Sequence, residues 1–223
     1  MAGLVLPIIS SCARSPWFKA TRDLTTAYGD HEGRLTPVIF ERAIADEYRV
    51  LRTQAGIFDV PERPLEIRGP DAAAFLDFVF TRKVSTMAVD RGRYGLMCHD
   101  DGGIACDGVV FRLAEDWFWY VHADRDVFTW LNALKVGHDV EIRDPQAWAI
   151  QIQGPSSLDI LDACVDGGAP EGFKYYHARQ VTAGGQNVLI SRTGWTGELG
   201  FEVYNMDPNV DGLALWSHLM AAG

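Results

Sequence analysis

Leu65-Glu66-Ile67-Arg68-Gly69-Pro70 is followed 85 residues later by Ile150-Gln151-Ile152-Gln153-Gly154-Pro155. In both copies apolar and polar residues alternate up to a Gly-Pro pair, which is typical of a half-buried strand that ends in a tight turn. Apolar residues then recur at helical spacing after each proline, a residue that suits the first turn of a helix. Each copy therefore predicts a strand, a tight turn and a helix.

The residues downstream of each copy continue the agreement. Both copies predict a hairpin, then a third strand and then a helix. In these helices Trp130 and Gly137 stand in the same relation as Trp216 and Gly223, at an offset of 86 residues. We interpret the chain as a tandem duplication. The predicted strands are 93–98, 104–113 and 117–122 in the first copy, and 177–183, 187–193 and 201–204 in the second.

The predicted fold class is α+β, built from tandem β-α-β-β-β-α units of ferredoxin-like or split βαβ character, with helices on one face of antiparallel sheet. Residues 17–223 form the expected domain, with repeats over about 64–143 and 147–223, after a flexible tail over residues 1–16. A strand over 140–143 closes the first copy, whereas the second copy stops at Gly223. We therefore expect an unpaired edge in the second sheet and interpret the chain as a fragment or a truncated form.

The overall charge disfavours two classes of partner. Lys and Arg number 20 against 30 Asp and Glu, which gives a formal net charge of -10. Such a field repels phosphate backbones and anionic lipids, so we expect neither a nucleic-acid nor a membrane partner. The four cysteines show no CxxC pair and the histidines no ligand spacing, so no metal site is predicted. A reducing compartment follows, namely the cytoplasm, or the mitochondrial matrix in a eukaryote.

Asp107 is the sharpest single candidate for chemistry. It lies in phase with Val109, Phe111 and Leu113 on one predicted strand, so its carboxylate points where apolar side chains point. A carboxylate placed against a core needs partners, and such groups are enriched at functional sites. We expect Asp107 to be mostly buried. The alternative is that Gly108 marks a bulge that turns Asp107 towards solvent.

The loop over residues 192–200 is a candidate for binding a planar ring. It contains three glycines, two threonines and Trp195, which together offer backbone donors beside a flat aromatic surface. Glu202 follows on a strand, and a carboxylate is a natural acceptor for two parallel N–H groups on a heterocycle edge. Loops of this composition often serve only as connections. We find no Walker-type phosphate loop, no GxGxxG after a strand and no GxSxG turn.

Several short motifs, taken in order, resemble the glycine-cleavage T-protein or aminomethyltransferase family. The resemblance covers about residues 37–223 and implies a clover-like, three-domain folate enzyme, of which this chain supplies the folate-binding portion and lacks the C-terminal domain. The implied cofactor is tetrahydrofolate. The motifs are Ala55-Gly56-Ile57-Phe58-Asp59-Val60, Arg68-Gly69-Pro70-Asp71-Ala72, Asp101-Gly102-Gly103-Ile104 through Asp107, Gln153-Gly154-Pro155, and Arg192-Thr193-Gly194-Trp195-Thr196-Gly197-Glu198 with Gly200-Phe201-Glu202.

The resemblance also implies roles for individual residues. Asp107 matches the family's essential carboxylate, near the folate nitrogens that receive the one-carbon unit. Tyr94 and Tyr175 match tyrosines that line the folate pocket, and Glu202 matches the glutamate that grips the pterin ring. Trp195 takes the place of a tyrosine in the family's loop, which keeps a flat surface but replaces a hydroxyl by an indole donor.

The sequence departs from the family pattern at other positions. Pro61-Glu62-Arg63-Pro64 stands where glycine-cleavage enzymes usually have Ser-His-Met-Gly, Cys106 precedes Asp107 where they have Asp, and His122 replaces an asparagine of the pocket strand. The segments Glu62-Arg63, Leu113 to Asp116 and Ala123 to Asp126 look more like the branch that includes dimethylsulfoniopropionate demethylase. The identity of the one-carbon donor is thereby open.

The leading hypothesis is a tetrahydrofolate-dependent transferase that moves an aminomethyl or methyl group from a small donor to a folate nitrogen. The donor is either an aminomethyl group on a lipoyl carrier protein or a methylated sulfonium or amine compound. A non-catalytic folate-binding module is the rival. Asp107 is present and a Lys-Gly-Cys-Tyr type motif is absent, which favours the enzyme. A separately encoded chain that completes the C-terminal part is a further alternative.

Overall fold

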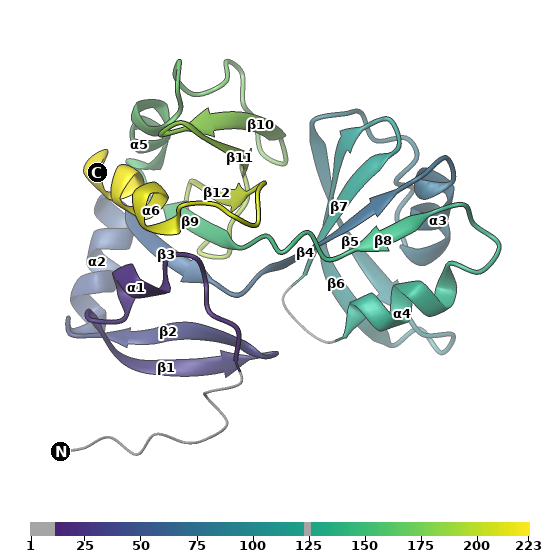
Figure 1. Cartoon of the computed structure of the whole chain (residues 1–223), viewed down its shortest axis with the longest axis horizontal. Coiled ribbons are helices and arrows are strands. Elements are labelled where there is room, and N and C mark those ends of the chain that lie inside the picture. The colour runs from purple at the N-terminus through teal and green to yellow at the C-terminus, as the bar shows by residue number, and fades with distance from the viewer. Residues whose placement is uncertain (1–11, 123–125) are drawn as a thin grey trace.

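The computed structural model describes residues 12–122 and 126–223. Within them the strands form two five-stranded sheets and one separate hairpin, and the helices cover the outer faces (Figure 1). The first repeat contains β4 (Arg63–Arg68), α3 (Ala72–Val79), β5 (Arg91–Cys98), β6 (Ile104–Ala114), β7 (Trp117–His122), α4 (Val127–Leu134) and β8 (Glu141–Arg143). The second contains β9 (Ala149–Gln153), α5 (Ser157–Cys164), β10 (Ala178–Ala183), β11 (Gln186–Ser191), β12 (Gly200–Asn205) and α6 (Gly212–Ala221).

Five elements precede the repeats. They are α1 (Phe18–Thr21), β1 (Thr25–His31), β2 (Arg34–Phe40), α2 (Ile44–Thr53) and β3 (Gly56–Val60). β1 and β2 form the separate hairpin. The strand orders of the two sheets are β5-β6-β7-β4-β8 and β10-β11-β12-β9-β3, and all neighbouring strands are antiparallel. The predicted α+β class and the two hairpins are confirmed.

The Gly-Pro turns of the two repeats have equivalent surroundings. Gly69 and Gly154 both have positive φ, at 136° and 125°. The Gly69 amide donates to the carbonyl of Asp116 at the start of β7, and the Gly154 amide donates to Leu199 at the start of β12. A β-carbon on Gly69 would lie 2.4 Å from a backbone carbonyl oxygen, and one on Gly154 would lie 2.5 Å from another. The turns therefore require glycine for the same reason, which supports the duplication.

The expected unpaired edge of the second sheet is wrong. β3 pairs with β9 in the place where β8 pairs with β4, so that Gly56 lies opposite Gln153 as Glu141 lies opposite Arg68. A strand from before the repeats thus lies at this edge of the second sheet. The sequence pattern misses this exchange because pairing between distant segments leaves no local periodicity.

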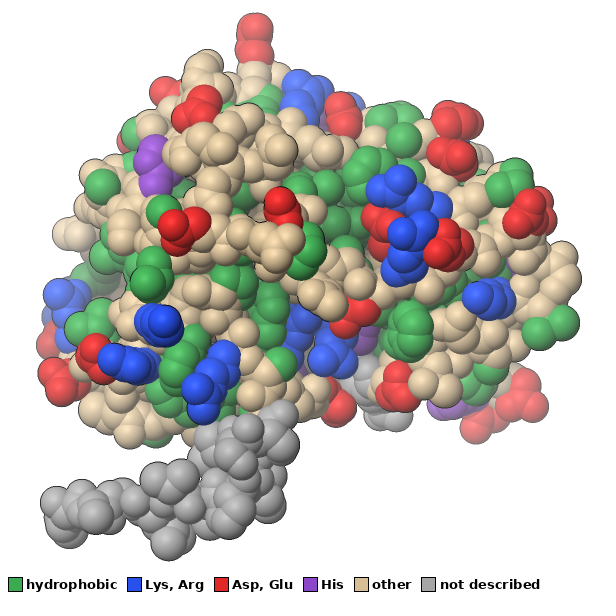
Figure 2. All heavy atoms as spheres, in the orientation of Figure 1, with side chains coloured by type: hydrophobic (Ala, Val, Ile, Leu, Met, Phe, Trp, Pro, Cys, Tyr) green, Lys and Arg blue, Asp and Glu red, His purple; other side chains and the backbone are tan. Residues whose placement is uncertain are grey.

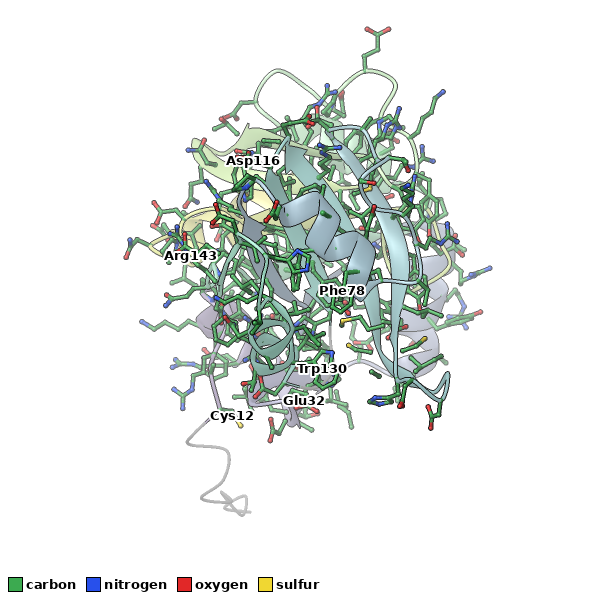
Figure 3. All side chains as sticks on the ribbon, turned by 90° about the vertical axis from the view of Figure 1, so that its right-hand side faces the viewer. Cys12, Glu32, Phe78, Asp116, Trp130 and Arg143 are labelled. Atoms are coloured by element: carbon green, nitrogen blue, oxygen red, sulfur yellow. The ribbon has the colours of Figure 1, made fainter. Side chains whose placement is uncertain are left out.

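The match of Trp130 to Trp216 is also wrong. Asp126 and Asp211 cap the two helices by accepting from backbone amides three residues on, which aligns α4 with α6 at an offset of 85 residues. Trp130 then corresponds to Leu215. Trp130 is 43% exposed whereas Trp216 is 8% exposed. Figure 3 views the face of the molecule on which Trp130 lies, and Phe78 of α3 is exposed there as well.

The side chains divide into three apolar clusters that give the molecule its layers. Alternate residues of β4, β6 and β7, including Ile67, Val110 and Phe118, pack under α3 and α4. Residues of β9, β11 and β12, including Ile152 and Phe201, pack under α5 and α6. The third cluster lies between the inner faces of the two sheets and contains Phe111, Trp119, Leu189 and Tyr204. The inner faces are therefore where residues from both repeats meet.

Edge strands of the two sheets also meet. The amide of Gly92 in β5 donates to the carbonyl of Tyr176, just before β10, at 2.6 Å, and the amide of Ala178 donates to Asp90 at 3.1 Å. An isolated antiparallel bridge joins Arg91 to His177. These bonds hold the segment of Tyr175 and Tyr176 against the first sheet.

Residues 12–16, which the sequence assigns to the flexible tail, are part of the fold. Ala13 forms a bridge with Arg34 of β2, and the Ser15 hydroxyl donates to Asp59 of β3 at 2.7 Å. Burial raises the pKa of Asp59 to about 6, while the Ser15 hydrogen bond acts in the opposite direction. Residues 1–11 lie outside the described part of the chain.

Charged side chains of both signs are intermixed over β8 on the face that Figure 2 shows. Arg143 pairs with Glu141 at 2.5 Å, and Arg68 pairs with Glu66 at 3.0 Å while its guanidinium lies over the Trp117 ring. Among the described residues, no helix is long and apolar enough to cross a membrane.

Candidate functional site

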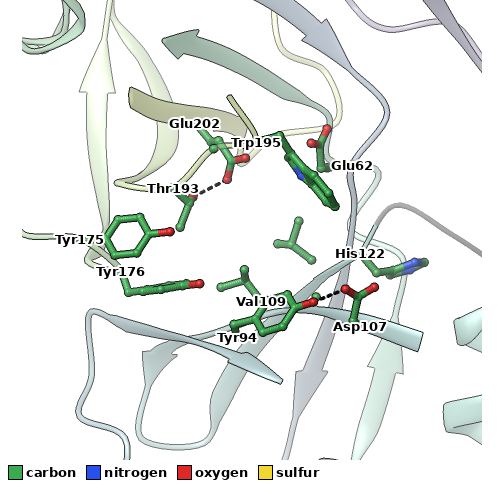
Figure 4. A pocket seen from close by; sticks show the side chains of 13 residues that line it. Glu62, Tyr94, Asp107, Val109, His122, Tyr175, Tyr176, Thr193, Trp195 and Glu202 are labelled. Carbon is green, nitrogen blue, oxygen red and sulfur yellow. Dashed lines mark hydrogen bonds between the residues drawn. The ribbon is translucent and has the colours of Figure 1, made fainter. Parts of the chain in front are cut away.

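A cavity of about 220 Å³ lies between the inner faces of the two repeats (Figure 4). Its first wall comes from β5, β6 and the end of β7, and its second from β12, the loop after β11 and the segment before β10. The structure brings all six predicted site residues to this cavity: Tyr94, Asp107, His122, Tyr175, Trp195 and Glu202.

Asp107 lies on the inner face of β6, in phase with Val109 and Phe111 as predicted. Gly108 pairs with Gly95 without a shift of register, so the bulge alternative is wrong. Gly108 has a different role, because its α-carbon lies close to β7. A β-carbon added to Gly108 would lie 2.2 Å from the Val121 carbonyl oxygen. Asp107 is half-buried rather than mostly buried, because its carboxylate lines the cavity and does not enter the core.

Tyr94 on the neighbouring strand donates a short hydrogen bond from its hydroxyl to Asp107 Oδ2. This bond is the largest cause that raises the pKa of Tyr94 to about 12. The Tyr94 hydroxyl is therefore protonated at neutral pH and orients the carboxylate. Behind them, the Tyr120 hydroxyl donates to the Asp107 carbonyl oxygen at 2.7 Å, and the His122 ring stacks on the Tyr120 ring at 5.4 Å.

Glu202 is buried on the opposite wall, and its carboxylate is well supplied with donors. Oε2 accepts hydrogen bonds from the hydroxyls of Thr193, Tyr204 at 2.6 Å and Ser191 at 3.3 Å. Oε1 accepts from the amide nitrogen of Gln151 at 2.7 Å. The hydroxyls fix the carboxylate in place, and Oε1, which accepts one hydrogen bond from Gln151, keeps a further lone pair for a ligand N–H group.

Glu62 is a second buried carboxylate beside Glu202. It lies in the connection between β3 and β4, where the chain crosses from one sheet to the other. Its Oε1 accepts from the same Gln151 nitrogen at 3.0 Å. Among the described residues, its Oε2 has no hydrogen-bond partner although it is buried. Burial, and then the neighbouring charge of Glu202, raise the pKa of Glu62 to about 8.

Gln153 shapes the glycine-rich loop that carries Trp195. Its side-chain nitrogen donates to the carbonyls of Thr193 at 3.2 Å and Phe201 at 3.3 Å, and its oxygen accepts from the Thr196 hydroxyl at 2.8 Å. A β-carbon on Gly194 would lie within 2.2 Å of the Gln153 side chain. The loop thus packs around the buried side-chain amide of Gln153. Arg52 of α2 also holds the loop, through an ion pair with Glu198.

Aromatic rings form the mouth of the cavity. Trp195 is 72% exposed and Tyr175 is 62% exposed, although both are large and apolar. The ring centroids of Tyr175 and Tyr176 lie 4.4 Å apart. Tyr176 has φ of 60°, a left-handed conformation that is unfavourable for a bulky residue. Exposed rings that converge on a cavity provide surface for stacking a planar ligand.

Seven residues that line the cavity were not among the predicted site residues, and those with polar or charged side chains are Glu62, Tyr176 and Thr193. The sequence marks Glu62 only through the departure of Pro61-Glu62-Arg63-Pro64 from the family pattern. It gives no signal for the left-handed backbone of Tyr176. Thr193 could have been found from its place two residues before Trp195. Among the described residues, no group of three His, Cys, Asp or Glu side chains is arranged to hold a metal ion.

The fold and the inner cavity place the chain in the class of duplicated α+β domains with a cavity between the repeats. The sequence matches the GCVT N-terminal domain over residues 17–223, and the chain belongs to this family.

Curated relatives include an aminomethyltransferase from Alkaliphilus oremlandii, 35% identical over 94% of this chain and 58% of the relative. Another, from Streptomyces avermitilis, is 38% identical over 80% of this chain and 49% of the relative. The chain thus spans about half the length of the curated relatives it matches.

Two solved structures share the fold. Glycine cleavage system aminomethyltransferase T from Bartonella henselae superposes with a TM-score of 0.84 at 23% identity, covering 94% of this chain and 57% of that one. Heterotetrameric sarcosine oxidase from Corynebacterium sp. U-96 gives a TM-score of 0.59 at 15% identity, covering 94% of each chain. These likenesses establish the architecture of both repeats.

Proposed function

We propose that the cavity binds tetrahydrofolate and that the protein transfers a one-carbon unit to a folate nitrogen, as an aminomethyltransferase of the T-protein type. The observation that carries the proposal is the convergence of Asp107, Glu202 and the exposed Trp195 ring on one cavity. Membership of the family and the names of the curated relatives support the same function.

The residues of the cavity fit a reduced pterin. Trp195 and Tyr175 offer flat surfaces, and Glu202 Oε1 is an acceptor for the N–H groups of the ring edge. Folate supplies the nucleophilic nitrogen that takes up the one-carbon unit. A ring held at Glu202 extends across the cavity towards Asp107 on the opposite wall, which is where this proposal places the reacting nitrogen (Figure 4).

Asp107 and Tyr94 act on the reacting centre in this proposal. The Tyr94 hydroxyl bond orients the Asp107 carboxylate, which holds the folate in place and stabilises positive charge as it develops on the nitrogen. Holding the donor and acceptor beside each other supplies much of the rate, because it converts an encounter into an intramolecular step. Val109 and Val121 also line the cavity and add apolar surface to it.

The relatives' names favour an aminomethyl group as the unit that is transferred. We propose a lipoyl carrier protein as the donor of that group. The departures at Glu62 and His122, both of which line the cavity, leave a methylated sulfonium or amine compound as the second candidate.

A product assay tests the proposal. The protein is incubated with tetrahydrofolate and either an aminomethyl-lipoyl carrier protein or a methylated sulfonium compound. The masses of the folate products are then measured by mass spectrometry. We expect one donor to give a folate that carries one additional carbon. Binding of tetrahydrofolate without product from any donor would favour the non-catalytic folate module, and absence of binding would refute the proposal altogether.

A further inference from the structure

The cavity contains one buried acceptor that neither the fold nor the proposed reaction uses. Glu62 is 6% exposed, lines the cavity, and has Oε2 without a partner among the described residues. An unsatisfied carboxylate oxygen at this depth is unfavourable for the free protein, since desolvation is not offset by a hydrogen bond. Such a group persists where a ligand supplies the missing partner.

The geometry around Gln151 joins Glu62 to Glu202. One amide nitrogen donates to Oε1 of both carboxylates, at 3.0 Å and 2.7 Å, so the two acids flank a single side chain. After these bonds, Glu202 Oε1 and Glu62 Oε2 are the acceptors that remain. The residues that line the cavity include three acids and neither Lys nor Arg. This end of the cavity therefore suits a ligand edge that bears N–H donors.

We propose that Glu62 and Glu202 form a two-carboxylate subsite, bridged by Gln151, in which Glu62 Oε2 accepts a hydrogen bond from the amino-bearing edge of the pterin. The inference rests on the proposed function and assigns to Glu62 a binding role. It also accounts for a carboxylate at this position. The unpaired oxygen of Glu62 lowers the stability of the free protein, and the same oxygen becomes a hydrogen-bond acceptor when the ligand binds.

Proton linkage gives the proposal a signature. Burial, and then the charge of Glu202, raise the pKa of Glu62 to about 8 and keep it largely protonated at neutral pH. A backbone hydrogen bond of Glu62 and the charge of Arg34 act in the opposite direction, and Asp59 adds to the rise. An N–H donor favours the ionised form, so binding at pH 7 displaces the Glu62 proton into solution. The number of protons released follows from the difference between the binding enthalpies that calorimetry measures in two buffers of different ionisation enthalpy.

The variants are Glu62→Gln and, as a matched control, Glu66→Gln. Glu66 is also a buried inner-face carboxylate, bonded to the Trp117 indole at 2.8 Å, but it does not line the cavity. The probes are tetrahydrofolate and its analogue in which a methyl group replaces the 2-amino group. Affinity and proton release are measured by calorimetry, and the thermal midpoint at pH 8.5 is measured without ligand.

We expect Glu62→Gln to weaken tetrahydrofolate about tenfold or more, to abolish the proton release, and to weaken the methyl analogue much less. Without ligand its thermal midpoint should rise by about 2 °C or more, because a buried charge is removed. Glu66→Gln should leave affinity and proton release unchanged.

Equal weakening of both probes, or a fall in the midpoint of Glu62→Gln with unchanged affinity, would assign Glu62 a structural role and overturn the inference. Unchanged affinity of Glu62→Gln for tetrahydrofolate overturns it as well, while the proposed function stands. If the wild-type protein binds neither probe, the proposed function itself fails.

Discussion

Asp107 and Tyr94 show how two neighbouring strands build a reactive group at the scale of single residues. Leu96 lies directly opposite Asp107 in the sheet, and Tyr94 reaches the carboxylate from two residues along the same strand. Strand phase puts both side chains on the inner face. The pair is half-exposed because the cavity interrupts the apolar layer between the sheets, which explains why phase predicts the direction of Asp107 but not its burial.

Replacing Asp107 by Asn tests its role in the transfer. The variant keeps the shape of the side chain and removes its charge. We expect turnover to fall by about a hundredfold or more while the affinity for folate changes much less, because the carboxylate acts on charge that develops during transfer. Turnover and thermal midpoint are measured on the same sample. Turnover close to that of the wild type would remove Asp107 from the mechanism.

Glu62 predicts how the stability of the free protein depends on pH. Its pKa rises from 4.5 in the unfolded chain to about 8 in the folded protein, so the folded state binds more protons between these values. The contribution of Glu62 to the free energy of unfolding therefore falls as the pH rises from about 4.5 to 8. Urea unfolding at a series of pH values should show a shallower fall for Glu62→Gln. Parallel curves for the two proteins would contradict the assignment.

At the scale of elements, the Gly-Pro turns determine where each helix begins. Gly69 and Gly154 lie against the backbone just before the edge strands β8 and β3, at Asp139 and Gln54. The close approach locks strand, turn and edge strand together. It also explains why β3 lies beside β9 as β8 lies beside β4, because Gln54 precedes β3 as Asp139 precedes β8.

Alanine at these turns should be strongly destabilising. Gly69→Ala and Gly154→Ala each combine a positive φ with a β-carbon that clashes with a backbone oxygen. We expect losses of more than about 2 kcal/mol in the free energy of unfolding from urea titration. Gly102→Ala is the matched control, since Gly102 has φ of 86° but open space around it, and should lose only about 1 kcal/mol. Similar losses at all three positions would show that the close contacts are unimportant.

The sequence predicts elements and faces better than it predicts partners. Alternation and turn chemistry identify the hairpins of both repeats and the inward direction of Asp107, whereas the role of Glu202 in the pocket comes from the family resemblance. The place of β3 beside β9 and the burial of Glu62 both depend on segments about a hundred residues apart, and neither leaves a local pattern. The alignment of α4 with α6 shows a related limit. The pair Trp130 and Trp216 suggests an offset that is one residue too large, whereas the capping residues Asp126 and Asp211 align the two helices correctly.

At the scale of the whole molecule, the duplication creates the site. Two sheets with covered outer faces bring their inner faces together, and the apolar cluster of Phe111, Trp119, Leu189 and Tyr204 fills part of the space between them. The cavity occupies the remainder, with Asp107 on one wall and Glu202 on the other. Both repeats therefore contribute residues to the proposed folate site, and Glu62 joins them from the connection between β3 and β4.

A crystal structure of the protein with tetrahydrofolate tests this account most directly. We expect the pterin ring between Trp195 and the inner sheet faces, with its amino-bearing edge at Glu202 and Glu62 and its reactive nitrogens towards Asp107. A ring bound outside this cavity, or turned so that its amino-bearing edge faces Asp107, would contradict the account.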